Sequence, residues 1–243
     1  MADTEESKFK FFVYIVESPS SVDLYHKRSE SDLLRQAINL NLIPCIDRVA
    51  ISREAFEAAI RVGLYEEMKK FPGLIPVIHI SAHGFCDGIQ LSNGEIIEWA
   101  QLRELVKPVN EALKGSLLIC MSSCEGYSGS RMAMTTSEDE YPFFALVGNV
   151  GKPTWSETAI GFATFYHLIS KGNFIIDSVE AMQVASGNAD FYVTTAEQSR
   201  QAYLEFIENL DSQEAQTELE QDVQNEEPSR LAKLLELSNE QQP

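Results

Sequence analysis

Short apolar runs recur along the chain at intervals that leave room for a helix between them. The first run, residues 11–16, is continuous and rich in β-branched and aromatic side chains. A continuous run of this kind is typical of a strand that is covered on both faces of a sheet. The same pattern predicts further strands at residues 42–51, 74–82, 116–122 and 143–147.

Between these runs, apolar residues recur every three or four positions, as on one face of a helix. Because strands and helices alternate, consecutive strands should run parallel, with crossover helices on both faces of the sheet. The sequence therefore predicts an α/β sandwich with a mostly parallel central sheet. The predicted helices occupy residues 31–40, 52–70, 99–113, 160–168, 178–186 and 195–210.

One segment departs from this alternation. Asn93-Gly94 separates the apolar segments 88–91 and 95–97. Asn-Gly between two such segments favours the two-residue turn of an antiparallel hairpin, because both turn residues tolerate positive φ. We expect a small β-hairpin here, projecting from the main sheet.

The end of the chain has a different composition. Residues 211–229 contain no Lys or Arg and many Gln and Glu, so they cannot bury enough apolar surface to offset the entropy of ordering. Four leucines between residues 231 and 237 would form a short amphipathic helix, either docked on the body or waiting for a partner. We predict one domain over residues 1–210 and an acidic tail over residues 211–243.

Composition and charge narrow the class of protein. Hydrophobic residues make up 44% of the chain and charged residues 23%, as in soluble globular proteins. The net charge of −18 opposes binding to nucleic acid or to an anionic membrane. The N-terminus is acidic where a secretory signal would be basic, and residues 11–16 are too few to span a membrane. We expect a cytoplasmic protein whose cysteines are reduced.

Two predicted strands end in a reactive side chain near a glycine. One runs through His79 to His83-Gly84, and the other through Cys120 to Ser122-Ser123-Cys124-Glu125-Gly126. Ligands bind outside the carboxyl ends of parallel strands, so His83 and Cys124 lie where sites form. His79 and Cys120 fall within the strands, where we expect core roles. If the two strands are neighbours, the imidazole of His83 and the thiol of Cys124 meet.

A histidine beside a thiol suits nucleophilic catalysis. The base takes the thiol proton and later protonates the leaving group, while the backbone N–H groups of Gly84 and Cys124 can stabilise an oxyanion. The alternative for Cys124 is a buried core thiol, although its polar flanks make burial less expected. A zinc site formed with Cys86 and Cys120 is disfavoured, because Cys120 and Cys124 would lie roughly 13 Å apart along a strand. We expect no metal and no organic cofactor.

This layout resembles the caspase-like cysteine peptidases, in which a His-Gly strand precedes a cysteine strand by roughly 50 residues. Within that group, residues 122–126 resemble the cysteine signature of the CHAT branch, the caspase-like domains associated with tetratricopeptide repeats in bacteria. Residues 144–149, Trp155 and residues 165–172 are also similar to that branch, and the resemblance covers about residues 75–187.

The resemblance implies that His83 is the general base and Cys124 the nucleophile of an endopeptidase. It also implies a regulated bacterial effector in antiviral or stress responses, switched on by a partner protein or a small signal molecule. Trp155 is followed by Ser156-Glu157 where the branch has Val-x-Asp, and no repeat array is present in this sequence. The activity of the peptidase would then be regulated by a separate protein, by a ligand or by self-association.

Acidic residues flank the expected site. Asp87 and Glu125, with the acidic segment 137–140, would favour a basic residue before the scissile bond. The alternative is a solvated surface on an acidic protein. By resemblance Trp155 would line the substrate cleft, and otherwise it would be a core aromatic.

Two other classes of function stay open. In the first, the same fold is a non-catalytic binding module and Cys124 is incidental, although packing alone does not require both glycine-containing motifs. In the second, the same two residues catalyse acyl transfer or deacylation, because a nucleophile does not define its substrate. We favour a cysteine endopeptidase that acts on peptides or proteins.

Overall fold

The structure is a computed structural model that describes residues 11–137 and 141–210. The predicted tail, 211–243, and the loop residues 138–140 lie outside the described residues. The chain divides into two compact units, residues 1–200 and residues 201–243. Of the second unit, residues 201–210 are described, and they are helical.

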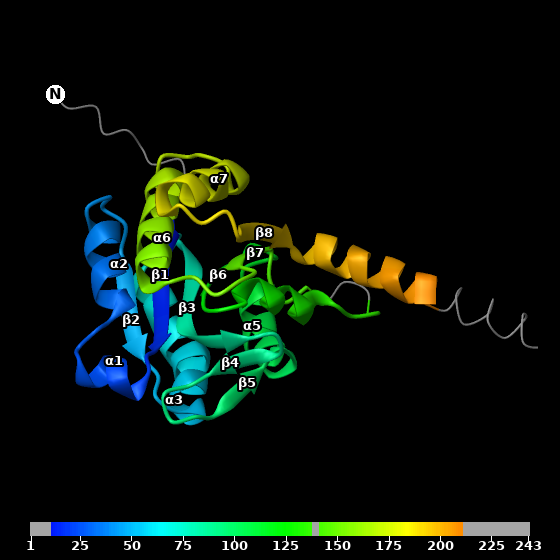
Figure 1. Cartoon of the computed structure of the whole chain (residues 1–243), viewed down its shortest axis with the longest axis horizontal. Helices are drawn as coiled ribbons and strands as arrows, with labels where there is room; N and C mark the ends of the chain where they lie inside the picture. The colour runs from blue at the N-terminus through cyan, green and yellow to red at the C-terminus, as the bar shows by residue number, and fades with distance from the viewer. Residues whose placement is uncertain (1–10, 138–140, 211–243) are drawn as a thin grey trace, which may run out of the picture. The chain divides into compact units, whose positions relative to one another are not determined.

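A twisted sheet forms the centre of the first unit (Figure 1). Its strands lie in the order β2-β1-β3-β6-β7-β8, and all neighbours are parallel except β7 and β8. The α/β sandwich with a mostly parallel sheet is therefore confirmed. The strands are β1 (Phe11–Ser18), β2 (Cys45–Val49), β3 (Ile75–Phe85), β6 (Leu118–Ser122), β7 (Ala145–Asn149) and β8 (Phe191–Thr195).

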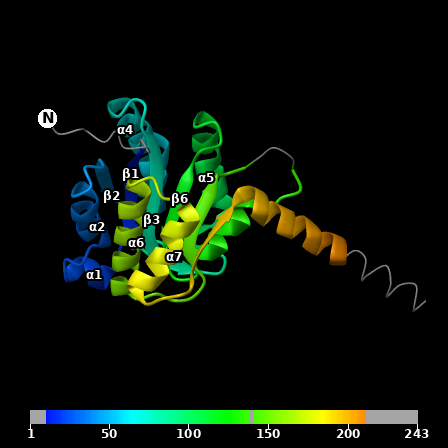
Figure 2. The same cartoon turned by 90° about the horizontal axis from the view of Figure 1, so that it is seen from above.

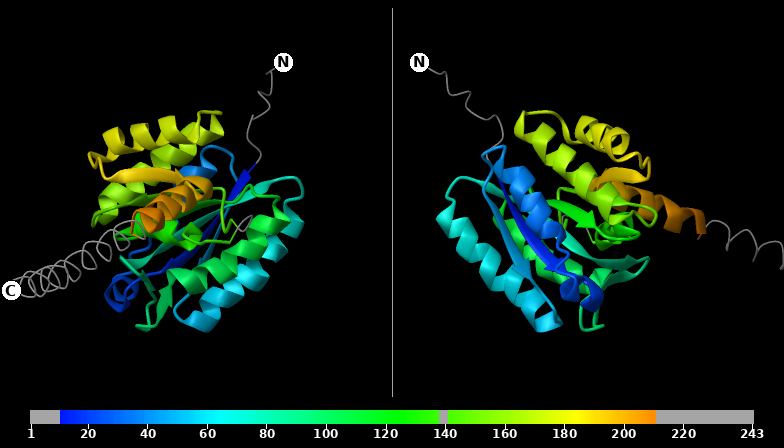
Figure 3. Two further views of the ribbon diagram at one scale, coloured as in Figure 1. Left: turned by 90° about the vertical axis from the view of Figure 1, so that its right-hand side faces the viewer. Right: turned by 60° about the vertical axis from the view of Figure 1, so that its left-hand side comes forward.

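Helices cover both faces of the sheet, as Figure 2 and the left view of Figure 3 show. Each face has its own apolar core, because alternate residues of a strand point to opposite sides. One face carries α2 (Glu30–Asn39), α6 (Trp155–Ser170) and α7 (Ile175–Ser186), and the other carries α3 (Arg53–Ala58), α4 (Leu64–Lys70) and α5 (Trp99–Ala112).

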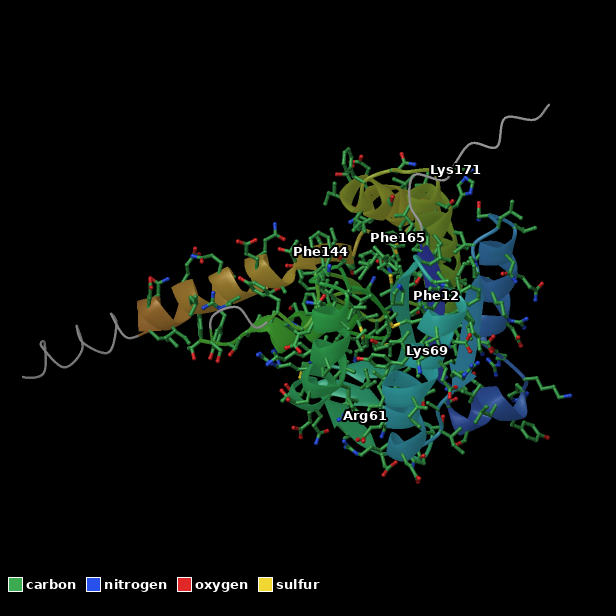
Figure 4. The ribbon with its side chains drawn as sticks, turned by 180° about the vertical axis from the view of Figure 1, so that it is seen from behind. Phe12, Arg61, Lys69, Phe144, Phe165 and Lys171 are labelled. Carbon is green, nitrogen blue, oxygen red and sulfur yellow. The ribbon has the colours of Figure 1, made fainter. Side chains whose placement is uncertain are left out.

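The central strands explain why this arrangement is stable. All eight residues of β1 are buried, which accounts for the unbroken apolar run over its first six residues, 11–16. Phe12 packs in the core of the α5 face, and Phe165 packs in the core of the α6 face. In Figure 4 both rings lie in the interior, whereas Arg61 and Lys69 lie at the surface. Burial of large rings such as these contributes roughly 2–3 kcal/mol each.

The predicted hairpin is confirmed. β4 (Gly88–Gln90) pairs antiparallel with the end of β3 and with β5 (Ile96–Glu98). At the turn, Gly94 has φ of +89°, which a residue with a side chain rarely adopts. The hairpin therefore continues β3 beyond the main sheet, starting at His83.

Three local features differ from the sequence prediction. The predicted helix 52–70 is interrupted by one π-helical turn, Ala59–Gly63, because the buried hydroxyl of Tyr14 donates a hydrogen bond of 2.9 Å to the carbonyl of Ala59. A short helix α1 (Ser21–Tyr25) lies in a stretch to which the sequence assigned no helix or strand. β8 was missed because it is an edge strand in which buried and exposed residues are mixed.

Within residues 11–137 and 141–210, no helix is both long enough and apolar enough to cross a membrane.

Candidate active site

The two strands that carry the reactive residues are neighbours in the sheet. β3 and β6 pair in parallel with His79 opposite Cys120 and Ser81 opposite Ser122. His83 and Cys124 each follow two residues later, so both lie at the carboxyl edge. They line one pocket, which also includes residues from β1, α1, α2 and α6. The structure thus places the predicted dyad at a shared cavity, the arrangement that parallel strands favour.

Gly84 shows how closely the two motifs approach each other. A Cβ atom added at Gly84 would lie 2.1 Å from the carbonyl oxygen of Cys124 and 2.8 Å from the Oγ of Ser123. No side chain fits at such distances. The closest atoms belong to the cysteine segment itself. Glycine is therefore required for the backbone beside His83 to contact the backbone of Cys124.

The turn after Cys124 is tight and left-handed. Glu125 has φ of +52°, and its backbone N–H donates a 2.6 Å hydrogen bond to the carbonyl of Gly151. A Cβ at Gly126 would lie 2.8 Å from the carbonyl oxygen of Met121. A non-glycine residue in this region stores strain that the surrounding structure must hold. This turn reverses the chain directly after the proposed nucleophile.

The thiol of Cys124 is half-buried and protonated at neutral pH. Burial raises its pKa above the usual value, and the charge of Glu125 acts in the same direction. The charge of Lys152 and the backbone N–H of Cys124 lower the pKa, but burial outweighs them. A thiol in this state needs a base to become a nucleophile, and the imidazole that shares its pocket is that of His83.

Glu30 is the pocket residue that the sequence did not identify. It begins α2, is 4% exposed, and accepts hydrogen bonds from Ser81 Oγ at 2.5 Å and from Ser122 Oγ at 2.7 and 2.8 Å. Burial raises its pKa to about 7; its hydroxyl partners lower the pKa, and nearby Glu17 raises it further. The available signal was the pair of serines, which interrupt two apolar runs at equivalent positions and need a buried partner.

The other predicted substrate residues are dispersed. Trp155, at the start of α6, is 44% exposed and lines the pocket. Asp87 lies in a different pocket and forms an ion pair of 2.8 Å with Arg131. Glu125 is held in the turn described above. The acidic side chains that line the dyad pocket are instead Glu30 and Asp23.

The inner residues have the core roles expected of them. His79 is fully buried, and its Nδ1 lies 2.9 Å from the hydroxyl of Tyr166. Burial lowers the pKa of His79 to about 3 and raises that of Cys120 to about 12. Both side chains are therefore neutral at physiological pH. Among the described residues, no group of three or more His, Cys, Asp and Glu is arranged to hold a metal ion.

Comparisons with known proteins give likenesses among solved structures. No family model matches the chain, and no curated protein matches it. Among solved structures, the crystal structure of the Arg specific cysteine proteinase gingipain R is similar with a TM-score of 0.42 and 12% identity. The match covers 74% of this chain and 43% of that chain, so this chain spans less than half of the proteinase. A likeness at this level carries no argument about the chemistry of the site.

Proposed function

We propose that the protein is a cysteine endopeptidase in which Cys124 is the nucleophile and His83 the general base. One observation carries the proposal: two reactive side chains from neighbouring strand ends line one pocket, and their backbones are in contact at Gly84. Packing alone does not require this combination, because a buried thiol in a core needs neither a pocket nor an imidazole.

The chemistry follows from this geometry. His83 accepts the proton of the Cys124 thiol while Sγ attacks the carbonyl carbon of the scissile peptide bond. The carbonyl oxygen becomes an oxyanion, which the backbone N–H groups of Gly84 and Cys124 would stabilise. When the intermediate collapses, the imidazolium of His83 protonates the leaving amine. Water then attacks the thioester, giving its proton to His83, and the acid product and the free thiol are released.

The electrostatics of the site support proton transfer during attack. Because burial holds the pKa of Cys124 above its ordinary value, the thiol keeps its proton in the empty site. His83 acts when a substrate excludes water and brings the carbonyl to the sulfur. The free protein should therefore react slowly with small alkylating agents and faster with peptide-linked ones.

The wider biological role rests on the sequence motifs. The His-Gly and Cys-Glu-Gly segments resemble those of the CHAT branch of caspase-like peptidases, which supports an effector that a partner protein or small molecule activates. Under this proposal the isolated chain is latent or weakly active. The acidic tail, 211–243, is the segment that we assign to recruitment of such a partner.

Labelling with peptide chloromethylketones tests the dyad directly. We expect modification of Cys124 in the native protein, identified by peptide mass, and its loss in the His83→Ala variant. Cys86 is exposed and serves as the internal control, because its alkylation should not depend on His83. Labelling of Cys124 that is unchanged in His83→Ala would contradict the dyad. If neither purified protein nor protein in host lysate is labelled, a non-catalytic binding module is the better description.

A further inference from the structure

The dyad pocket extends inward between the sheet and α6, and its inner end is a carboxyl group. The volume is about 70 Å³, about half that of a cavity that holds benzene (~150 Å³), so it has room for the end of one unbranched side chain and not for an aromatic ring. Glu30, Ser81 and Ser122 lie at the inner end, and His83 and Cys124 lie at the rim. A substrate that presents its carbonyl to Cys124 would therefore direct one adjacent side chain toward Glu30.

The position of Glu30 is fixed by the start of α2. Its backbone N–H donates a 2.6 Å hydrogen bond to Oε1 of Glu17, at the end of β1. The hydroxyls of Ser29 and Ser31 each donate a 2.7 Å bond to Oε2 of the same carboxylate. Glu17 thus holds this turn from behind and leaves the side chain of Glu30 directed at β3 and β6. The carboxyl group is set in place before any ligand binds.

The charges around the pocket are unbalanced. The carboxyl of Glu30 has only hydroxyl partners, from Ser81, Ser122 and Thr158, and no ion pair that involves it is found among the described residues. Asp23 adds a second carboxylate; it accepts a bond from Ser20 and has Arg28 at 3.6 Å. A buried carboxyl without a cation is a costly arrangement, which a cationic ligand would relieve.

A second polar group in the pocket also lacks a partner. Ser123 is 4% exposed, lines the pocket, and has no hydrogen-bond partner for its Oγ within the described part of the chain. Unsatisfied buried hydroxyls are rare in folded proteins, because each costs about 1–3 kcal/mol. The Oγ of Ser123 is packed beside Gly84 and Gly126, whose added Cβ atoms would each lie 2.8 Å from it, so the carboxyl of Glu30 is the pocket group that indicates a ligand with hydrogen-bond donors.

We propose that this pocket binds the side chain of the substrate residue that precedes the scissile bond, that the preferred residue is arginine, and that Glu30 selects it. The inference rests on the proposed peptidase function. A guanidinium group is planar and has five N–H donors, so it can bind the Glu30 carboxylate and neighbouring hydroxyl oxygens together. Lysine offers a single charged centre and should be second.

The protonation state of Glu30 makes this preference depend on pH. With a pKa of about 7 in the empty pocket, Glu30 is largely protonated in mild acid and cannot attract a cation. Binding of arginine requires the ionised form, so affinity should rise with pH and level off above about pH 8. Below that range it should fall by up to about tenfold per pH unit.

Other titratable groups face Glu30 and must be controlled. Glu17 lies behind it on β1, Asp23 lies on α1, His83 and Cys124 lie at the rim, and Tyr166 of α6 interacts with it electrostatically. The binding experiment therefore uses the Cys124→Ala protein with and without His83→Gln, which removes the titratable side chains at the rim and leaves Glu30 in place.

The test compares two nearly isosteric ligands on full-length Cys124→Ala protein by calorimetry. Acetyl-arginine methylamide carries the charged guanidinium, and acetyl-citrulline methylamide replaces it with a neutral urea. We expect the arginine ligand to bind at least about 30-fold more tightly at pH 8. Glu30→Gln, which keeps the shape and the hydroxyl contacts, should abolish the difference. Asp87→Asn, an acid neutralised outside this pocket, should retain it.

Two results would overturn the proposal. One is equal binding of the two ligands to the parent Cys124→Ala protein, and the other is a preference that survives Glu30→Gln. If Glu30→Gln does not fold, the two ligands are compared over a range of pH on the Cys124→Ala protein with and without His83→Gln. A preference for the arginine ligand that does not change with pH also contradicts the role of Glu30.

Cleavage assays separate this proposal from the peptidase function. In active protein, the ratio of kcat/KM for arginine over citrulline substrates should fall at least about 30-fold in Glu30→Gln. A binding preference without any cleavage would refute the peptidase and leave the pocket assignment intact. Cleavage without a preference would establish the peptidase and refute the role of Glu30.

Discussion

The same two strands carry two histidine–cysteine pairs, and only one is placed for chemistry. His79 and Cys120 are opposite each other in the sheet. His83 lies four residues after His79 on β3, and Cys124 lies four residues after Cys120, just beyond the end of β6. The inner pair is fully buried, with the pKa of the histidine lowered to about 3 and that of the thiol raised to about 12. The outer pair lines an open pocket.

The reactivity of a histidine–cysteine pair on these strands therefore depends on its position relative to the sheet edge rather than on residue type. Inside the sheet, desolvation disfavours both the imidazolium and the thiolate, so the inner pair stays neutral and unreactive. At the edge, the chain turns away and leaves room for a substrate beside Cys124. Substitutions at the two pairs should therefore separate catalysis from stability.

The largest expected contrast is between Cys124→Ala and Cys120→Ala. Loss of a nucleophile lowers kcat by about 10⁴-fold or more, whereas the half-exposed site should tolerate alanine with little change in unfolding free energy. Cys120→Ala should retain activity and destabilise the protein by about 1–2 kcal/mol, because it leaves a cavity in the core. Peptidase assays and urea unfolding of both variants check this. Loss of activity in Cys120→Ala without unfolding would contradict the inert role of the inner pair.

The next largest effect concerns the contact between the outer motifs. Gly84→Ala would place a methyl group 2.1 Å from the carbonyl oxygen of Cys124, so the two segments must separate. Displacement of catalytic groups by about 1 Å can lower the rate by about 100-fold. Gly161→Ala is the matched control, because its methyl group would meet side chains rather than backbone, Met182 at 3.0 Å and Phe191 at 3.6 Å. Comparable kcat/KM values for the two variants would show that the contact at Gly84 is not needed.

Features of the fold and the site that depend on residues close together in the sequence could be predicted, whereas features that depend on residues far apart in the sequence could not. The sheet, its helices and the hairpin followed from local patterns, and the placement of His83 and Cys124 followed from the rule for parallel strand ends. Glu30 could not be found in this way. In sequence it is one acid at a helix start; its burial depends on α2 packing beside the ends of β3 and β6, which are separated from it by 51 and 92 residues.

β8 shows the same limit within the fold. Its residues 191–195 form a short edge strand with a mixed burial pattern, and they pair antiparallel with β7. An edge strand has one neighbour, so its side chains carry a weaker apolar signal than those of β1. The interruption of the helix at Ala59–Gly63 likewise depends on the hydroxyl of Tyr14, which comes from a strand distant in the sequence.

A smaller effect is expected where the inner histidine meets its partner. Tyr166→Phe removes the hydroxyl that lies 2.9 Å from Nδ1 of His79, and Nε2 of that ring already has no partner in the described part of the chain. The loss should destabilise the protein by about 1–3 kcal/mol, the cost of an unsatisfied buried polar group. Tyr192→Phe, at a 46% exposed position, is the control and should change stability little. Urea denaturation measures both, and activity should be preserved in each.

The smallest effect concerns the electrostatic environment of the outer thiol. Lys152 lowers the pKa of Cys124, while burial and Glu125 raise it, so Lys152→Ala should move the pKa further upward. At neutral pH a higher pKa means less thiolate, and iodoacetamide should then alkylate Cys124 a few-fold more slowly than in the parent protein. In both proteins the rate should still rise above about pH 8.5, the ordinary thiol value, because the pKa of Cys124 lies above it. Lys171→Ala is the charge-matched control, because this lysine at the end of α6 is not among the charges that shift the pKa of Cys124. A rate in Lys152→Ala equal to that of the parent at every pH would show that burial alone sets the reactivity of Cys124, as it does for Cys120.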